Sequence, residues 1–308
     1  MKVKRDVTYI IVTWNNEKEI ENCLNSIYKF SPMGSKVIIV DNCSTDNTTY
    51  QILNKFPDAQ LIQNEKNLGF ACANNIALEL VETQYICYIN PDIILTEDII
   101  SPSIDALESF PEVGIVASQL RNPDGSHQHS YYNFATPFSM FSEVLHLGKL
   151  FPNFMRRRFF LNYYRTNKDF TPDWVIGAEM VLRTKEAKEI DGFSTDYFMY
   201  TEDMDICKKM NNILGKKIFY LVNSSLIHIG GASESQNINY SKQQKLFENM
   251  KKFVEKYHDT STSINTIKSM IVAYQVRLFF LKVFYYKYNR KLQIEKSEQA
   301  IIMLRKLL

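Results

Sequence analysis

The residues of this sequence that could do chemistry are polar side chains that directly follow apolar runs. In CYINPDIIL, residues 87–95, the apolar run stops at Asn90, Pro91 and Asp92, and apolar residues then resume. Because proline cannot donate a hydrogen bond to a sheet, a buried strand should end there. The amide and the carboxylate could then form an ordinary turn, or they could bind a ligand at the edge where open α/β sheets do so.

Three other turns near predicted strand ends carry polar residues of the same kind, namely Thr13-Trp14-Asn15, Asp41-Asn42 and Asn67-Leu68-Gly69. The carboxyl ends of parallel strands share one edge of a sheet, so these groups should converge on one crevice. Asp41 or Asp92 taken alone could be a turn or N-cap residue. Four such endings in succession favour a ligand site.

The predicted crevice lacks the glycine-rich loops that usually hold phosphates. Neither GxGxxG after the first strand nor GxxxxGK[ST] is present, which argues against a dinucleotide-binding dehydrogenase and a P-loop enzyme. Carboxylates at such an edge can hold phosphates through Mg²⁺ or Mn²⁺, which bind one or two protein carboxylates and complete their shell with phosphate oxygens and water. His127 and His129 form an HxH that could also bind metal, although a polar loop explains them as well.

Apolar runs and helical periodicity alternate along the chain. Strands are predicted at residues 7–13, 36–41, 60–64, 84–90 and 113–118, with helices over residues 20–28, 46–55, 73–81 and 97–109 between them. This alternation, with continuously apolar strands, predicts a parallel sheet covered on both faces. The regularity fails over about residues 119–170. It resumes with WVIGAEMVLR (174–183), a helix from Glu202 or Asp203, and KKIFYLV (216–222).

The composition is that of an ordinary globular protein. The 308 residues are 45% hydrophobic and 23% charged, and the five cysteines show no CxxC spacing, which suits a reducing cytosol. The apolar run near the N-terminus is too short for a signal peptide, and no stretch reaches the ~20 apolar residues of a spanning helix. We therefore expect a cytoplasmic protein.

Two segments combine basic and aromatic residues. KLFPNFMRRRFFLNYYRTNK, residues 149–168, contains six Lys/Arg and no acidic residue, so it could bind nucleic acid or insert its aromatic side chains into a lipid headgroup layer. Residues 264–308 hold nine Lys/Arg and two Asp/Glu, with apolar residues spaced alternately three and four apart. This stripe could pack against a helix of the same chain or of a second copy, or lie on anionic lipid.

Seven segments occur in the order and spacing of family 2 glycosyltransferases with the GT-A fold, and the chain most closely resembles their bacterial rhamnosyltransferase-like branch. They are VTYIIVTWNN, VDNCSTDNT, NEKNLGFACANNIAL, YINPDI, VIGAEMVLR, YTEDMDICKK and HIGGAS, within residues 5–235. The resemblance implies an α/β fold: a Rossmann-like, mostly parallel central sheet with helices on both faces. That domain would span residues 1–240, with a donor half to about residue 118 and an acceptor half from about 119. A helical extension would cover residues 241–308.

The resemblance also assigns residues to the donor side. Asp92 matches the final, metal-binding aspartate of an Asp-x-Asp motif, in which Asn90 replaces the first aspartate. His228 resembles a metal- or diphosphate-contacting histidine, and the expected cofactor is Mg²⁺ or Mn²⁺. Asp41 resembles the residue that accepts the ring N–H of a pyrimidine base. Thr13, Asn15, Gly69 and Asn75 would line the nucleotide pocket.

On the acceptor side, the Asp of the Glu202-Asp203 pair matches the family's catalytic base. Acids in the first turn of a helix are also favoured by the helix dipole, by about 0.3–1 kcal/mol, so the cluster could be structural. By resemblance, Asp203 takes the proton of the acceptor hydroxyl and Glu202 helps to hold the acceptor. Asp205 would cap or pair with a lysine. Lys209 stands where relatives often carry an arginine that grips the diphosphate.

The expected protein is therefore an inverting, metal-dependent glycosyltransferase. It would move a sugar, with dTDP-rhamnose as the expected donor and a UDP-sugar as the alternative, onto a lipid-linked or growing surface polysaccharide at the inner face of the cell membrane. Nucleic acid is not an expected partner, and a homo-oligomer could form through the C-terminal helices. A nucleotidyltransferase of similar topology would need a glycine-rich N-terminal loop that is missing. A non-catalytic scaffold would not need Asp92 and Asp203.

Overall fold

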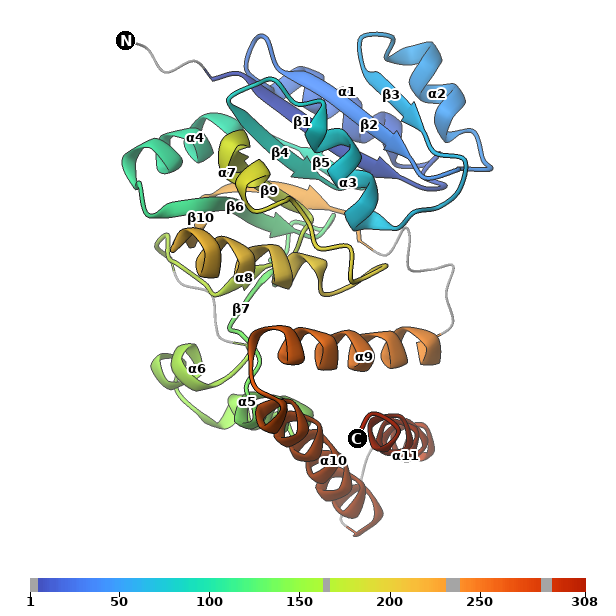
Figure 1. Cartoon of the computed structure of the whole chain (residues 1–308), viewed down its shortest axis with the longest axis vertical. Coiled ribbons are helices and arrows are strands. Elements are labelled where there is room, and N and C mark those ends of the chain that lie inside the picture. The colour runs from blue at the N-terminus through green and yellow to red at the C-terminus, as the bar shows by residue number, and fades with distance from the viewer. Residues whose placement is uncertain (1–4, 163–166, 231–238, 284–289) are drawn as a thin grey trace. The chain divides into compact units, whose positions relative to one another are not determined.

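The structure is a computed structural model that describes residues 5–162, 167–230, 239–283 and 290–308. The chain forms two compact units (Figure 1). Unit 1 is formed by Met1–Tyr131 and Thr166–Gln236, and unit 2 by Tyr132–Arg165 and Asn237–Leu308. The sequence had suggested that residues 132–165 belong with the acceptor half, whereas the structure groups this segment with the C-terminal helices.

Unit 1 is built around an eight-stranded sheet of strand order β3-β2-β1-β4-β9-β6-β10-β5. Its strands are β1 (Val7–Thr13), β2 (Lys36–Asp41), β3 (Gln60–Gln63), β4 (Tyr85–Ile89), β5 (Ile93–Leu95), β6 (Val113–Arg121), β9 (Glu179–Arg183) and β10 (Lys217–His228). Four of the seven pairings are parallel. The predicted α/β fold with a mostly parallel sheet is confirmed. Two short strands, β7 (Tyr131–Tyr132) and β8 (Trp174–Val175), lie outside this sheet.

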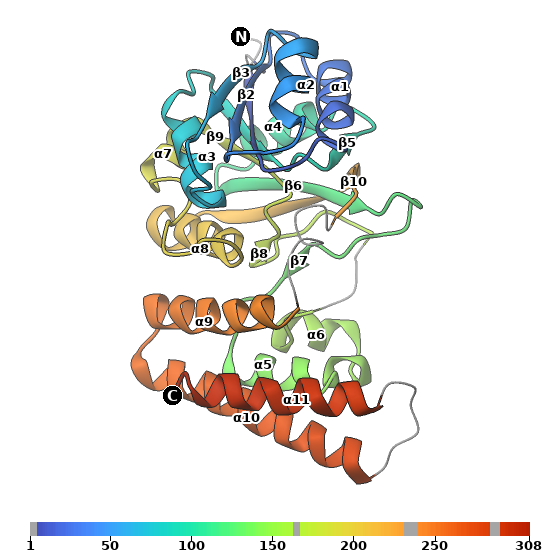
Figure 2. The same cartoon turned by 90° about the vertical axis from the view of Figure 1, so that its right-hand side faces the viewer.

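Helices cover both faces of the sheet (Figure 2). They are α1 (Ile20–Phe30), α2 (Thr48–Lys55), α3 (Phe70–Glu79), α4 (Ile100–Ser109), α7 (Thr184–Glu189) and α8 (Glu202–Leu214). Apolar residues of α1, α2 and α4 form one core with side chains from one face of the sheet. α3 packs against β1 and β2, and α8 packs against β6 and β10. The helices predicted from 3.6-residue periodicity in residues 20–109 are therefore present.

The segment at residues 174–183 differs from its prediction. It was expected to be one apolar strand that continued the alternation, but it breaks after Val175 and resumes at Glu179 as β9. β9 runs antiparallel to both neighbours, β4 and β6. β9 therefore begins at the edge where β1, β2, β4, β6 and β10 end. Burial of both faces made the apolar pattern of β9 the same as that of a parallel strand.

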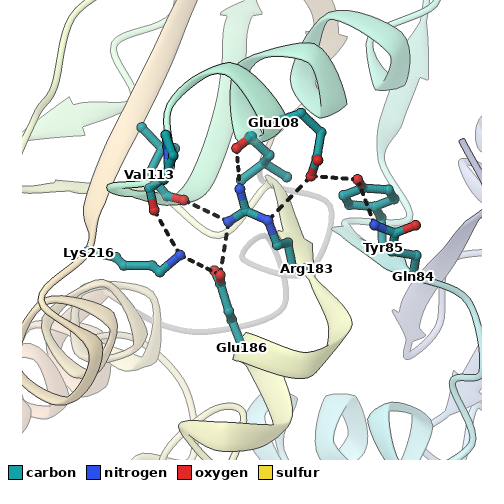
Figure 3. Close-up of polar contacts among 9 residues, drawn as sticks. Gln84, Tyr85, Glu108, Val113, Arg183, Glu186 and Lys216 are labelled. Atoms are coloured by element: carbon teal, nitrogen blue, oxygen red, sulfur yellow. Dashed lines mark hydrogen bonds and ion pairs between the residues drawn. The ribbon is translucent and has the colours of Figure 1, made fainter. Parts of the chain in front are cut away.

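The far end of β9 is fixed by Arg183, whose guanidinium is largely enclosed (Figure 3). Its Nη1 donates to the Val113 carbonyl at 3.0 Å and to Glu186 Oε1 at 2.9 Å, and its Nη2 donates to the Leu107 carbonyl. Lys216 Nζ also donates to Glu186 Oε1. Arg183 thus ties the end of β9 to the end of α4 and the start of β6.

A second acid completes this network from α4. Glu108 Oε1 lies 3.5 Å from Arg183 Nε and accepts a hydrogen bond from the Tyr85 hydroxyl at 2.8 Å (Figure 3). Burial and the Glu108 carboxylate raise the pKa of Tyr85 well above its usual value, so the phenol stays a donor. The start of β4 is therefore joined to the same network.

Unit 2 is helical in its described parts. Its elements are α5 (Pro137–Val144), a 3₁₀ helix η1 (Leu147–Leu150), α6 (Asn153–Phe159), α9 (Asn239–Tyr257), α10 (Thr260–Val283) and α11 (Arg290–Arg305). Ile267, Ile271, Tyr274 and Leu278, all from the predicted apolar stripe, pack in its core with residues of α5, α9 and α11. This part of the stripe is thus a seam within the chain. Among the described helices, none combines the length and apolar character needed to cross a membrane.

We predict that Arg183→Leu lowers the free energy of unfolding by ~3–5 kcal/mol, because it leaves the Leu107 and Val113 carbonyls without their buried donor and Glu186 with Lys216 as its remaining cation. Urea unfolding followed by circular dichroism measures the effect. The matched control is Lys36→Leu, which breaks an ion pair to Glu82, a residue whose side chain is 80% exposed, and should cost ~0–1 kcal/mol. Equal losses in the two variants would contradict a central role for Arg183.

Candidate active site

A cleft of about 330 Å³ lies in unit 1 at the edge where β4 and β10 end. Its walls come from the turn after β4, the break between β8 and β9, and the residues that lead into α8. The lining residues are Val12, Phe70, Asn90, Pro91, Asp92, Ile176, Gly177, Ala178, Met199, Tyr200, Glu202, Asp203 and His228. Five of the residues singled out from the sequence therefore meet in one cleft: Asn90, Asp92, Glu202, Asp203 and His228.

Backbone hydrogen bonds around the turn after β4 hold Asp92 in place. The Asn90 amide donates to the Ala178 carbonyl at 3.0 Å, and the Ile93 amide donates back to the Asn90 carbonyl at 3.3 Å. Pro91, which has no N–H to satisfy, occupies the turn between them. Asp92 is held at this point, 7% exposed, and the chain reverses into β5.

Asp92 and His228 are brought together by the antiparallel pairing of β5 with β10. His228 is the register partner of Ile93, the residue after Asp92. Asp92 Oδ1 lies 3.4 Å from His228 Nε2, and Asp92 Oδ2 accepts a hydrogen bond from the Gly230 amide at 3.1 Å. A carboxylate oxygen and an imidazole nitrogen thus face the cleft side by side.

Gln128, which the sequence did not single out, orients His228. Gln128 Oε1 lies 2.6 Å from His228 Nδ1, and Gln128 Nε2 donates to Asn122 Oδ1 at 3.0 Å. Because the amide nitrogen is engaged with Asn122, the amide oxygen accepts the proton of His228 Nδ1. A neutral imidazole that donates from Nδ1 has the lone pair of Nε2 free, which is the tautomer that a metal ligand requires.

These residues fit a divalent cation that takes part of its ligand shell from a substrate. Mg²⁺ or Mn²⁺ commonly binds one or two protein groups and completes its shell with phosphate oxygens and water, which Asp92 and His228 would allow. Within the described ranges, three or more His, Cys, Asp or Glu side chains nowhere cluster closely enough to hold a metal ion by themselves. His127 and His129 instead lie against the Tyr131 ring, with centroids 6.0 and 4.5 Å from it.

The cleft is also lined by the acid pair Glu202 and Asp203 at the start of α8. Asp203 Oδ2 accepts a hydrogen bond from the Gly177 amide at 3.3 Å, and its Oδ1 accepts one from the Met204 amide at 2.8 Å. Glu202 is buried, and its Oε2 has no hydrogen-bond partner among the described residues. Burial raises the pKa of both carboxyls, and the neighbouring Asp203 charge raises that of Glu202 further. The pair can therefore hold and exchange a proton near neutral pH.

The backbone before the acid pair is in an unusual conformation. Tyr200 and Thr201 have φ angles of 72° and 82°, a region that β-branched residues rarely adopt. Such conformations cost on the order of 1–3 kcal/mol each and cluster at functional sites. Asp205 helps to fix this loop, since its carboxylate accepts hydrogen bonds from Ser194 and from the Tyr197 hydroxyl.

Gly177 permits the close approach of α8. A Cβ at this position would lie 3.2 Å from the Cβ of Asp203, which is tighter than ordinary packing. The missing side chain at Gly177 therefore makes room for Asp203.

The residues expected to bind the nucleotide lie at the adjoining ends of β1 and β2. Thr13 and Asp41 are register partners, and both are buried. Asp41 accepts hydrogen bonds from the Ser44 amide, at 2.9 Å, and from the Ser44 hydroxyl. Asn15 Oδ1 accepts one from the Thr45 amide at 2.8 Å. The Thr13 hydroxyl is buried without a partner in the described part of the chain, so this end retains an unused polar group.

Gly69 lies where α3 begins and contacts the loop that precedes α8. Its φ is +83°, and a Cβ would lie 2.6 Å from the Phe198 carbonyl oxygen. Both the conformation and the contact require glycine. The Asn42 side chain donates to the Gly69 carbonyl at 3.2 Å, which joins this turn to the end of β2.

Asn75 and Lys209 make other contacts than those the sequence suggested. The Asn75 side chain exchanges two hydrogen bonds with the Phe193 backbone, at 2.8 and 2.9 Å. Lys209 Nζ donates to the carbonyls of Asp191 and Gly192, at 3.3 and 2.9 Å. Both side chains therefore hold the turn at residues 191–193, and neither is among the residues that line the cleft.

Glu179 is a further acid that the sequence reasoning missed. It follows Gly177-Ala178 directly, is 2% exposed, and accepts a hydrogen bond from the Ser118 amide at 2.7 Å. Its Oε1 has no partner among the residues that the structure describes, and burial raises its pKa to about 7. An acid inside the apolar run EMVLR was the signal that could have revealed it.

Comparison with known proteins gives a family and several relatives. The profile of the family "Glycosyl transferase family 2" matches residues 8–180. The chain is 25% identical over 236 residues to N-acetylglucosaminyl-diphospho-decaprenol L-rhamnosyltransferase of Mycobacterium tuberculosis, covering 71% of this chain and 74% of that protein. It is 28% identical over 168 residues to rhamnosyltransferase WbbL of Escherichia coli, covering 52% and 60%.

Solved structures share the fold at lower identity. The mannosyltransferase PcManGT from Pyrobaculum calidifontis, in complex with GDP-Man and Mn²⁺, superposes with a TM-score of 0.60 at 14% identity, covering 97% of this chain and 86% of that one. GalNAc-T7 with UDP, GalNAc and Mn²⁺ gives a TM-score of 0.62 at 12% identity, covering 99% and 57%. At these identities the similarity shows a common fold.

We predict that Glu202→Gln raises the free energy of unfolding at pH 8 by about 1–3 kcal/mol and leaves it unchanged at pH 4. The pKa of Glu202 is raised in the folded protein, so the protonated carboxyl contributes fully to stability at pH values below its pKa in the unfolded chain, about 4.3. As the pH rises through the folded-state pKa, the carboxyl ionises and this contribution is lost. Glutamine does not ionise, so the variant keeps its stability at high pH. Urea unfolding between pH 4 and 9 measures the difference.

The control for the pH series is Glu189→Gln, which changes an exposed acid at the end of α7. This variant should follow the pH dependence of the unmodified protein. If Glu202→Gln also follows it, the Glu202 carboxyl ionises normally in the folded state and the electrostatic description of the pair is wrong.

Proposed function

The chain belongs to glycosyl transferase family 2, in its rhamnosyltransferase-like branch, and we propose that this glycosyltransferase moves a sugar from a nucleoside diphosphate to a lipid-linked saccharide with inversion at the anomeric carbon. One observation carries the proposal. A single cleft is lined by both the Asp92–His228 pair and the Glu202–Asp203 pair. The first pair suits a diphosphate with its cation, and the second suits the removal of a proton.

Asp203 is proposed as the general base. Glycosyl transfer with inversion needs one group that takes the proton of the acceptor hydroxyl as that hydroxyl attacks the anomeric carbon. A carboxyl whose pKa is raised by burial is a better proton acceptor than an ordinary one. Two backbone N–H groups, from Gly177 and Met204, fix its oxygens in the cleft.

Glu202 is proposed to hold the acceptor sugar. Its pKa is raised above that of an ordinary glutamic acid by burial and by Asp203, so it can remain protonated and donate a hydrogen bond to a sugar hydroxyl. Its Oε2 has no partner among the described residues and is therefore available for this contact. The two neighbouring acids would thus have different roles because their surroundings differ.

Asp92 and His228 would hold Mg²⁺ or Mn²⁺ together with the donor diphosphate, and Gln128 would keep His228 in the required tautomer. When bound, the cation supplies positive charge to the leaving diphosphate. Support comes from PcManGT and GalNAc-T7, two proteins of the same fold that were solved with Mn²⁺. Asn90 offers an uncharged amide to the donor ribose, where an aspartate would add a second charge.

The proposed donor is dTDP-rhamnose, because two relatives are named as rhamnosyltransferases. Asp41 would accept the ring N–H of the pyrimidine base, with Thr13, Asn15 and Gly69 lining the nucleotide site. A UDP-sugar is the alternative, since the structure of Staphylococcus aureus TarS 1-349, which has a TM-score of 0.52 and 18% identity, was solved with UDP. The name of the mycobacterial relative points to a diphospho-polyprenol acceptor, which would place the reaction at the inner face of the cell membrane.

We predict that dTDP-rhamnose with Mn²⁺ stabilises the protein against heat, by ~2.7 kcal/mol at 100 times its Kd. Asp92→Asn should abolish the Mn²⁺-dependent part, and Gln128→Leu should weaken Mn²⁺ binding about 10- to 100-fold through the orientation of His228. Calorimetry with Mn²⁺ and thermal shift with dTDP-, UDP- and GDP-sugars measure these effects.

Asp58→Asn, which changes an exposed aspartate before β3, is the control for the loss of a negative charge. It should bind Mn²⁺ and donor normally. Unchanged Mn²⁺-dependent binding in Asp92→Asn would rule out the metal assignment. A preference for GDP-sugars would rule out the role of Asp41 in reading a pyrimidine.

We predict that Asp203→Asn retains donor affinity while turnover falls by ~10²–10⁴, because the side chain keeps its shape but no longer accepts a proton. Glu202→Gln should raise the acceptor KM with a smaller loss of turnover. Steady-state transfer to a saccharide acceptor and donor binding by calorimetry separate the two effects. Near-full turnover in Asp203→Asn with an inactive Glu202→Gln would reverse the roles. Donor binding without transfer or hydrolysis in the unmodified protein would instead indicate a scaffold.

A further inference from the structure

Residues 147–160 of unit 2 display large apolar side chains in a way that a globular surface usually avoids. This segment, η1 and α6 with the linker between them, is called here the basic–aromatic segment. Leu150 is 78% exposed and Phe154 is 75% exposed, with Phe151 and Phe159 also exposed. Several exposed apolar side chains within ten residues mark an interaction surface more often than a free one.

The exposed side chains project from a backbone that is firmly held. The Asn133 side chain donates to the carbonyls of Arg157 and Phe160, both at 2.8 Å. The Phe160 ring is buried, and it packs against Phe151 and Phe138 with centroids 5.2 and 5.7 Å apart. Phe160 thus anchors the segment while Leu150 and Phe154 remain outside. The exposure is a feature of the local structure, since the segment has a buried anchor of its own.

The charge of the segment is uniformly positive. Lys149, Arg157 and Arg158 are exposed, and residues 149–168 contain six Lys/Arg and no acidic residue. Phe154, Arg157 and Arg158 are three and four positions apart on α6, so they lie on one face of the helix. Cations that flank protruding apolar side chains match a surface of anionic headgroups above an apolar layer.

We propose that the basic–aromatic segment docks the protein on an anionic lipid bilayer, with Leu150 and Phe154 inserted at the headgroup boundary and Arg157 and Arg158 against phosphate groups. The choice of a bilayer as the occupant rests on the proposed function, because a lipid-linked acceptor lies in one. It also rests on Leu150, since a leucine at the most exposed point gains from entering an apolar layer and has no ring to stack on a nucleic acid base.

The test is cosedimentation of the full chain with vesicles of phosphatidylglycerol and phosphatidylcholine, without donor or acceptor. The intact protein should bind these vesicles at low salt, bind pure phosphatidylcholine weakly, and dissociate as salt is added. Arg157→Gln with Arg158→Gln should weaken binding about fivefold for each charge removed. Leu150→Ser with Phe154→Ser should weaken it at least tenfold even at low salt.

Matched controls change similar residues of unit 1. Leu53→Ser removes a leucine that is 57% exposed on α2, and Lys185→Gln with Lys217→Gln removes two exposed cations. These variants should bind vesicles like the intact protein. All variants should keep their circular dichroism spectrum and their transfer to a water-soluble acceptor, so a failure of lipid binding is distinct from a failure of the transferase.

Two results would overturn the proposal. One is that the intact chain does not bind phosphatidylglycerol vesicles at low salt, or that the variant with the Leu150 and Phe154 substitutions binds them as well as the intact chain does. The other is tight binding of a single-stranded RNA oligonucleotide that is lost with the same substitutions and outcompetes vesicles, which would make the segment a nucleic-acid surface.

Discussion

The antiparallel insertion of β9 between β4 and β6 is the constraint on which the rest of unit 1 depends. At one end, Arg183 is bound by two carbonyls and a buried carboxylate, so the strand cannot slide without leaving a cation unpaired in a mostly enclosed place. At the other end, the chain that enters β9 delivers Gly177 and Ala178 to the cleft. A fixed register at Arg183 therefore sets where Gly177 meets Asp203 and where Ala178 meets Asn90.

The two pairs of polar residues that line the cleft are organised by different physical means. Asp92 and His228 are aligned by strand pairing and by hydrogen bonds from Gly230 and Gln128, so their geometry is set before a ligand arrives. Glu202 and Asp203 instead follow two residues with positive φ, and burial disfavours their charged forms. The Glu202–Asp203 pair and the two residues before it are therefore held in an unfavourable state in the absence of substrate, and binding a polar acceptor would relieve part of this cost.

Unit 2 shows how one composition can serve two purposes. The apolar stripe of the C-terminal residues and the basic, aromatic segment around α6 look alike as sequences, since both mix Lys/Arg with large apolar side chains. Ile267 and Ile271 are buried against α5, α9 and α11, whereas Leu150 and Phe154 stand outside the fold. The two segments differ in whether another element covers their apolar side chains. The periodicity of one segment cannot show this, because it does not reveal which other elements pack against it.

The sequence by itself determined the α/β class and, apart from β5, the strands and helices of residues 7–121, because apolar periodicity and turn chemistry are local properties. The resemblance to the family, rather than periodicity, suggested that Asn90, Asp92, Glu202, Asp203 and His228 would meet, and they line one cleft. Only the tertiary structure decided the direction of β9, because a strand that is buried on both faces has the same apolar sequence pattern whether it pairs parallel or antiparallel. It also assigned Asn75 and Lys209 to the turn at residues 191–193, and it revealed Gln128 and Glu179 as polar residues behind the cleft. Those roles depend on partners distant in the chain, and a side chain's type does not specify which distant group will satisfy its hydrogen bonds.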